Sequence, residues 1–149
     1  MLMTRVILVA AATTFTALLA VGAAGAATPT AYRAQVNAIC RTYNPTFRRL
    51  HAQVNDAISR NDQVAEGLAL GQAFALALVE DGRIEKTPVP AAMRTTMTPI
   101  LNRLKTIDSY IRLGQSKRDP SLLVVAGNLM APLVGAFDAA GLRDCGSDS

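Results

Sequence analysis

The sequence predicts an all-α protein: a four-helix antiparallel bundle with bent, proline-containing helices and one disulfide that joins its two ends. After the first 26 residues, apolar side chains recur at helical spacing in four stretches. Short polar or Gly/Pro-rich segments separate these stretches, and helices with short connections pack as antiparallel neighbours. The chain has only two cysteines, Cys40 and Cys145, and they lie near its opposite ends.

The first 26 residues have the features of a cleavable export signal. An apolar run from Val6 to Val21 follows a single basic residue, and Ala24-Gly25-Ala26 fits the small-residue cleavage rule. The run is shorter than the about 20 apolar residues of a membrane-spanning helix, and threonines interrupt it. We predict a signal peptide over residues 1–26, cleavage after Ala26 or alternatively Ala27, no stable membrane span after cleavage, and one helical bundle domain over residues 27–149.

The first helix is predicted to begin at Thr28 or Thr30, either of which can cap it, and to stop near Ser59. Its apolar residues keep one helical register on both sides of Pro45. We favour a single bent helix over two helices, the second capped at Asn44, because the shared register would otherwise be a coincidence.

The second helix is predicted to be capped by Asn61 and to end at Asp81-Gly82. Gly67 and Gly71 lie one turn apart, which predicts a close approach by another helix. The apolar ridge expected to face the core comprises Val64, Leu68, Gly71, Ala75 and Leu78, widened by Phe74 and Val79.

The third helix is predicted from about Pro90 to Leu113, with Gly114 as its stop. Pro99 either bends it or leaves a shorter helix capped by Thr98. Its predicted ridge runs over Met93, Met97, Ile100, Leu101, Leu104, Ile107 and Ile111.

The fourth helix is predicted to start at Asp119-Pro120, a cap followed by proline in the first turn, and to end at Gly141. Pro132 is expected to bend it. It is the most apolar of the four helices, so we place it most centrally in the bundle. Its predicted ridge comprises Leu122, Val125, Ala126, Leu129, Leu133, Phe137 and Ala140.

The two cysteines are predicted to form a disulfide, because an even cysteine count behind an export signal is typical of exported proteins. Cys40 lies about ten residues inside the first helix, whereas Cys145 follows the fourth. The C-terminal segment must therefore run back along the first helix for about two turns, or the first helix must begin later.

The charge pattern excludes a dedicated nucleic-acid surface. The chain carries a net charge of +4, and its acidic and basic residues are interspersed. Basic blocks such as Arg48-Arg49 and Lys117-Arg118 are too short to make a nucleic-acid footprint. A solvated surface is the simpler interpretation.

No catalytic or metal motif is evident. His51 is the sole histidine, and both cysteines are assigned to the disulfide, which excludes the usual zinc patterns and leaves no Cys–His nucleophile. Glu80, Asp81 and Glu85 form the densest acidic group; it lacks the spacing of a calcium loop, and we interpret it as a solvated helix end. No metal and no cofactor is predicted.

Two alternatives concern the interior of the bundle. A cavity for a small apolar ligand, lipid- or haem-like, would be lined by methionine and aromatic side chains beside the single histidine, although ordinary core packing explains the same pattern. Its candidate lining is Tyr43, Phe47, His51, Met93, Met97 and Met130. A small secreted enzyme of chorismate-mutase type would instead use inward-pointing basic residues; the candidates are Arg33, Arg41, Arg103 and Lys105.

The two ends of the chain resemble those of a group of small exported helical proteins of actinobacteria. The matching residues are Asn37–Asn44, which include Ala-Ile-Cys, and Gly141–Gly146, which read Gly-Leu-Arg-Asp-Cys-Gly, with a Pro-rich step like Pro88-Val89-Pro90 between. The resemblance implies a bacterial, exported, helical protein with the Cys40–Cys145 disulfide. It carries over no other functional residue.

We therefore expect an exported protein, whether secreted, periplasmic or in the cell envelope, that acts without catalysis by binding a protein or an envelope component. The carrier of a small apolar ligand is the first alternative, and the small secreted enzyme is the second. An interaction domain predicts a full core and exposed apolar patches, a carrier predicts an apolar cavity, and an enzyme predicts converging polar groups with shifted pKa values. The sequence names neither the partner nor the oligomeric state.

Overall fold

The computed structural model describes residues 28–146, and all regular structure within that range is helical. The long helices are α1 (Pro29–Ser59), α2 (Gln63–Lys86), α3 (Arg94–Lys117) and α4 (Pro120–Ala139), with short 3-10 turns η1 (Ala91–Met93) and η2 (Arg143–Cys145). The prediction of an all-α chain with four long helices is confirmed. The predicted signal peptide and its cleavage site lie outside the described residues.

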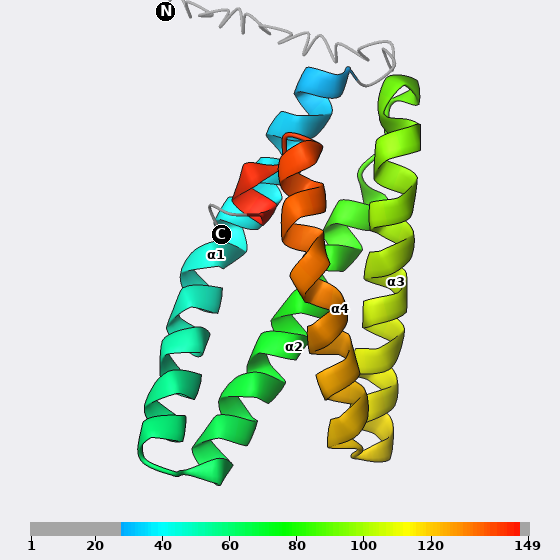
Figure 1. Cartoon of the computed structure of the whole chain (residues 1–149). Coiled ribbons are helices and arrows are strands. Elements are labelled where there is room, and N and C mark those ends of the chain that lie inside the picture. The colour runs from blue at the N-terminus through cyan, green and yellow to red at the C-terminus, as the bar shows by residue number, and fades with distance from the viewer. Residues whose placement is uncertain (1–27, 147–149) are drawn as a thin grey trace, which may run out of the picture.

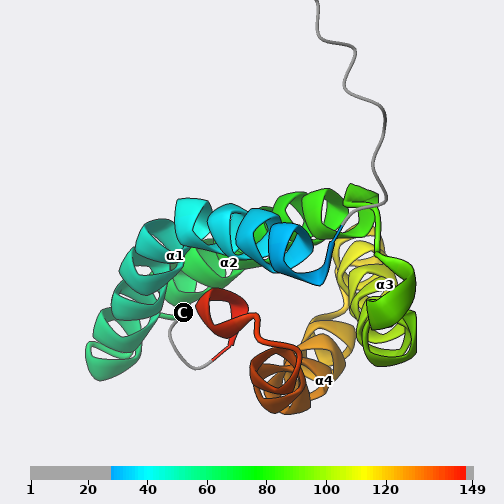
Figure 2. The same ribbon diagram turned by 90° about the horizontal axis from the view of Figure 1, so that it is seen from above.

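The helices associate in pairs. α1 packs mainly on α2 and α3 mainly on α4, while contacts between the two pairs are fewer. The chain reverses direction within each pair, and the pairs meet where the first half of α1, the end of α2 and the end of α4 converge (Figure 1). The turn between α1 and α2 and the turn between α3 and α4 lie far apart, as the view from above also shows (Figure 2).

Three prolines lie inside uninterrupted helices: Pro45 in α1, Pro99 in α3 and Pro132 in α4. The first helix is therefore one helix rather than two. Thr28 caps it by accepting a hydrogen bond from the backbone N–H of Ala31, at 3.1 Å.

Both tight turns use a residue in the left-handed conformation. Asn61 and Arg118 each have φ 54°, and the residue after each donates its N–H back into the preceding helix. Asp62 and Asp119 then cap the next helices. The predicted cap at Asn61 is one residue early, because Asn61 closes α1 and Asp62 opens α2.

Arg118 offers a test of this turn. Replacing Arg118 with glycine should raise the free energy of unfolding by about 1 kcal/mol, because glycine adopts a positive φ without the steric cost that a Cβ imposes. Lys117→Gly, one residue earlier in helical conformation, should lower it by a similar amount. Urea denaturation of both variants checks this; two changes of the same sign would contradict the turn geometry.

Two predicted helix ends are wrong. α2 continues through Gly82 to Lys86, and α3 continues through Gly114 to Lys117. A Cβ at Gly114 would lie 2.8 Å from Cδ2 of Leu123 and 3.2 Å from the carbonyl oxygen of Asp119. Glycine at 114 therefore allows α3 and α4 to approach each other rather than ending the helix.

The core lies where the two pairs meet, and α3 contributes most to it. Most of the ridge predicted for α3 is buried, since Met93, Met97, Ile100, Leu104, Ile107 and Ile111 are at most 4% exposed. The ridge prediction for α2 is largely wrong: α2 buries Ala69, Ala77, Asp81 and Ile84, and of its predicted ridge only Phe74 and Leu78 pack against the core. The ridge predicted for α4 is largely confirmed, since Ala126, Leu133, Phe137 and Ala140 are buried, but most other residues of α4 are exposed, so its predicted central position is wrong.

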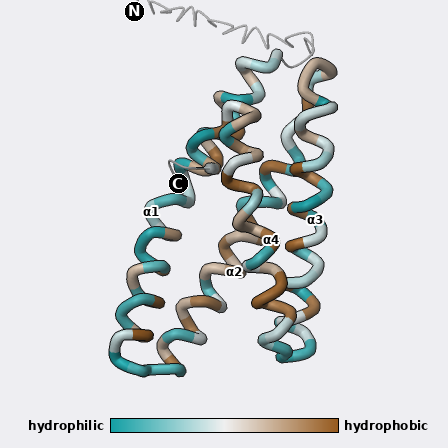
Figure 3. The backbone as a smooth tube through the Cα atoms, in the orientation of Figure 1, coloured by the Kyte–Doolittle hydropathy of each residue, from teal (hydrophilic) through white to brown (hydrophobic). Residues whose placement is uncertain are grey.

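Much of the predicted α2 ridge is exposed because α2 packs on α1 and α3 mainly through other side chains. Val64, Leu68 and Val79 are 75%, 64% and 51% exposed. A Cβ at Gly67 or Gly71 would meet nothing within 4 Å. The prediction that another helix approaches closely at these two glycines is therefore wrong. The tube coloured by hydropathy shows the apolar character of α4 along its length (Figure 3).

The C-terminal segment, residues 140–146, runs back along α1 as predicted. Gly141 has φ 77°, and the N–H of Leu142 donates to the carbonyl of Phe137 at 2.8 Å, which turns the chain and buries Leu142. The Cys40–Cys145 disulfide, with its Cα atoms 5.2 Å apart, fixes the segment and confirms the predicted bond.

Polar side chains along one face of α1 support the same segment. Asn44 donates to the carbonyl of Asp144 at 2.8 Å, and Arg41 pairs with the Asp144 carboxylate at 2.8 Å. Arg33 Nε donates to the carbonyl of Ala140 at 2.8 Å. Asn44 is buried, so its hydrogen bond replaces the water that the side chain loses.

Candidate functional site

Two adjoining grooves lie between α1, α2, α4 and the C-terminal segment. The larger, about 390 Å³, is lined by Asn44, Phe47, Arg48, His51, Val54, Leu70, Ala73, Glu80 and Cys145. The smaller, about 160 Å³, is lined by Phe47, Ala77, Glu80, Asp81, Leu104, Met130, Leu133, Val134, Phe137 and Cys145. Phe47, Glu80 and Cys145 line both grooves, so the two grooves border each other at these residues.

A pair of carboxyl groups is buried beside the smaller groove. Asp81 on α2 is 6% exposed and Asp108 on α3 is 9% exposed. The two side chains are hydrogen-bonded to each other, which requires that one of them carries a proton. Oδ2 of Asp81 and Oδ1 of Asp108 are buried and have no hydrogen-bond donor from outside the pair. The hydrogen bond between the two carboxyls is therefore what offsets the loss of water from the pair.

The electrostatics assign the shared proton to Asp81. Burial, and then the neighbouring negative charge of Asp108, raise the pKa of Asp81 to about 9. Burial also raises the pKa of Asp108, but the hydrogen bond from Asp81 and the positive charge of Arg112 lower it in part. At neutral pH, Asp81 therefore donates its proton to the carboxylate of Asp108.

Glu80 extends this acidic cluster into both grooves. Burial raises the pKa of Glu80 to about 7, so its protonation changes near neutral pH. We define the acid cluster as Glu80, Asp81 and Asp108. The interpretation of the end of α2 as solvated is wrong for Glu80 and Asp81, because α2 continues past them and packs this face inward.

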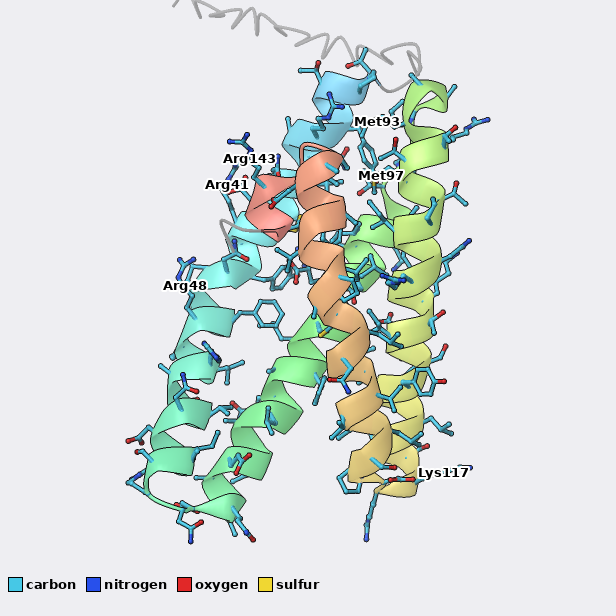
Figure 4. All side chains as sticks on the ribbon, viewed as in Figure 1. Arg41, Arg48, Met93, Met97, Lys117 and Arg143 are labelled. Carbon is cyan, nitrogen blue, oxygen red and sulfur yellow. A yellow bond between two sulfur atoms is a disulfide. The ribbon has the colours of Figure 1, made fainter. Side chains whose placement is uncertain are left out.

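The predicted lining residues do not all meet. Phe47 and His51 line the larger groove, and Phe47 and Met130 line the smaller one. Tyr43 instead lies under the guanidinium of Arg83, 5.3 Å from the ring centre. Met93 and Met97 are core residues, and Figure 4 shows them between the start of α1 and the start of α3. The residues predicted to line one cavity therefore lie in three places: the two grooves, the position beside Arg83, and the core.

The basic residues considered for an enzyme do not converge either. Arg33 and Arg41 hold the C-terminal segment. Arg103 and Lys105 are exposed on α3. Within residues 28–146, no group of three or more His, Cys, Asp or Glu side chains is placed to hold a metal ion.

Sequence reasoning singled out Glu80 and Asp81 but missed Asp108, although a signal for it exists. Asp108 lies four residues after Leu104 and three before Ile111, which places a carboxyl on the apolar ridge of the third helix. A carboxyl on such a ridge either disrupts the core or finds a protonated partner within it. Only the packing of α2 against α3 reveals that the partner is Asp81.

A second surface feature is the exposure of the most apolar helix. Among the described residues, α4 alone is long and apolar enough to cross a membrane by length and composition, and only 17% of it is buried. Val124, Val125 and Val134 on α4 are 62%, 38% and 42% exposed. This surface has no covering element within residues 28–146.

The comparisons with known proteins give no family. No protein-family model, curated protein or solved structure matches this chain. The function therefore has to be argued from the grooves, the acid cluster and the exposed apolar surfaces.

Proposed function

We propose that the protein is an exported, non-enzymatic binding domain that contacts a protein or a cell-envelope component through its exposed apolar surfaces. In this proposal the four helices form one antiparallel bundle. The two helix pairs pack against each other at one end and diverge at the other. The observation that carries the proposal is the exposure of the α2 stripe, defined as Val64, Leu68, Gly71, Ala75 and Val79.

The stripe has the spacing of a helix face that normally packs against another element. Its members are separated by three or four residues, so they lie on one side of α2. Single exposed apolar side chains are common on protein surfaces, whereas contiguous apolar patches mark interaction sites. The valines of α4 add a second apolar surface on the other helix pair.

The disulfide supports export. Disulfides persist in oxidising compartments and are rare where cellular thiols keep cysteines reduced. Both cysteines of the described chain are in the bond, so no thiol remains for catalysis or metal binding. This use of cysteine is consistent with the leader-like N-terminus of the sequence.

Photo-crosslinking in the intact host tests the proposal. A photoreactive residue at position 68 on α2 or 124 on α4 should give a defined adduct, because both side chains are more than half exposed on apolar surfaces. Position 103, exposed and polar on α3, serves as the control. Adducts that are absent, or equally strong at position 103, would contradict binding through these surfaces.

A further inference from the structure

We propose that a second copy of this chain covers the α2 stripe, so that the two α2 helices pack antiparallel about a two-fold axis beside Gly71. The inference rests on the proposed function, because it names the partner for one of the two apolar surfaces described there. It concerns the α2 stripe alone and leaves the valines of α4 outside the contact.

The exposed residues of α2 form an uncharged surface that ends in opposite charges. Between Asp62 and Arg83, none of the exposed positions of this helix carries a charge. Asp62, the cap of α2, is exposed at the start of the stripe, and Arg83 and Lys86 are exposed beyond its other end. Two copies lying in the same direction would bring like charges together. Antiparallel copies place the acidic end of each stripe near the basic end of the other, so charge complementarity favours this orientation.

The antiparallel arrangement also pairs side chains that fit in size. If Val64 of one copy lies opposite Val79 of the other, Leu68 lies opposite Ala75, because both helices rise equally per residue. Gly71 then lies beside the two-fold axis, in the middle of the contact. A large side chain against a small one lets two helix faces interlock. In the same register the acidic end of each stripe meets the basic end of the other to within about one helical turn.

The surface around the stripe has room for a second helix. A Cβ at Gly71 would meet nothing within 4 Å, so another backbone can approach this position without displacing a side chain of the chain itself. Ala75 and Val79 also line a groove of about 330 Å³ between α1 and α2, and Leu50 forms part of its α1 wall. In the proposed register, Leu68 of the second copy lies opposite Ala75 and enters this groove.

Other charges near the two ends of the stripe agree with this orientation. Asp56 and Arg60, close to the start of α2, pair with each other at 2.7 Å and so leave the negative charge of Asp62 in place. Arg49 on α1 lines the same groove as Val79, so it adds positive charge toward the basic end.

A second copy is favoured over an unrelated protein because the stripe is complementary to itself. Two-fold association uses the same patch on both chains, so one helix face has to fit its own image. The α2 stripe meets this requirement both in the sizes of its side chains and in the charges at its ends. Two-fold dimers are also the most common assemblies of soluble proteins.

Sedimentation equilibrium of the oxidised, exported protein tests for the dimer. Over the micromolar range the protein should show a reversible monomer–dimer equilibrium. Gly71→Arg puts a charge beside the two-fold axis and should raise the dissociation constant at least about tenfold. Gly127→Arg is the matched control and should leave it unchanged, because Gly127 is also an exposed helical glycine whose Cβ would meet nothing within 4 Å. Leu68→Gln, a second variant in the stripe, should weaken the dimer as well, and circular dichroism confirms that all three variants are folded.

A photoreactive residue at position 68 tests the orientation. In a mixture of isotopically labelled and unlabelled protein, part of the adduct should join one labelled chain to one unlabelled chain. Tandem mass spectrometry should locate the new bond near Ala75 of the other copy, whereas parallel helices would place it near position 68 itself.

Three results would overturn the proposal: a monomer at every concentration, a dimer unaffected by both stripe variants, or a bond between the two positions 68. A monomeric protein that still gives an adduct of different mass at position 68 in the host would show that the partner is another molecule, and the proposed binding function would stand. A monomer in solution together with equal adducts at positions 68 and 103 in the host would contradict both.

Discussion

Reduction of the Cys40–Cys145 disulfide is expected to lower the free energy of unfolding by about 4–5 kcal/mol. The bond spans 105 residues, and closing so long a loop restricts the unfolded chain strongly in the chain-entropy account. The helices themselves do not need the bond, since α1 packs on α2 and α3 packs on α4 through contacts that the disulfide does not make. The helical content of the cold, reduced protein should therefore stay close to that of the oxidised protein.

Urea denaturation with and without a phosphine reductant, followed by circular dichroism, measures the change. Asn44→Ala provides a separate perturbation of the same region, because it removes the hydrogen bond to Asp144 and leaves the disulfide intact. We expect that variant to cost about 1–2 kcal/mol. Free thiols in protein taken from its host, or a urea midpoint that does not change after reduction, would show that the disulfide does not stabilise the protein.

The second large effect is an inverted dependence of stability on pH. Asp81 and Glu80 have folded pKa values of about 9 and about 7, both above their ordinary values of 3.8 and 4.5. Between the ordinary and the raised pKa the folded protein binds more protons than the unfolded chain, so stability falls as pH rises. The contribution is fully present below about pH 4 and is lost progressively up to about pH 9.

The free energy of unfolding should therefore be higher at pH 5 than at pH 8.5, by several kcal/mol if both groups act as the structure indicates. Asp81→Asn keeps a donor toward Asp108 without a titrating proton, so the slope with pH should flatten. At pH 8.5 the variant should be more stable than the parent by about 2 kcal/mol or more.

Urea midpoints of parent, Asp81→Asn and Glu85→Gln at four pH values test the sign and the assignment. Glu85→Gln is the matched control, because Glu85 acts on Asp81 only through its charge and lies outside the pair. If the stability of the parent protein rises with pH across this range, Asp81 is ionised in the folded protein. That result would contradict the shared proton between Asp81 and Asp108.

The sequence predicted well the features that local chemistry decides. Asp119-Pro120 opens α4 and Gly141 closes the turn after it, because a cap, a fixed φ and a permitted positive φ are properties of single residues. The ridge of α3 is buried as expected. The return of the C-terminal segment along α1 could be predicted because Cys40 lies inside the first helix and Cys145, its disulfide partner, follows the fourth.

The α2 ridge shows where this reasoning fails. Val64 and Leu68 lie on one face as the periodicity indicates, yet that face points to solvent. An amphipathic pattern shows that a helix has an apolar side, but it does not show that another element of the same chain covers it. Gly114 fails for a related reason, since a glycine that ends a helix and a glycine that admits a neighbour look alike in sequence.

The sequence by itself determined the helices, most of their caps, the disulfide and the direction of the C-terminal segment, because each depends on neighbours along the chain or on a single covalent bond. Only the tertiary structure decided that the two helix pairs meet at one end and form the core there. It also decided that much of α4 stays exposed and that Asp81 contacts Asp108. Those outcomes depend on how faces of different helices meet, and the pKa values of Glu80 and Asp81 are raised because that meeting removes water from their carboxyls.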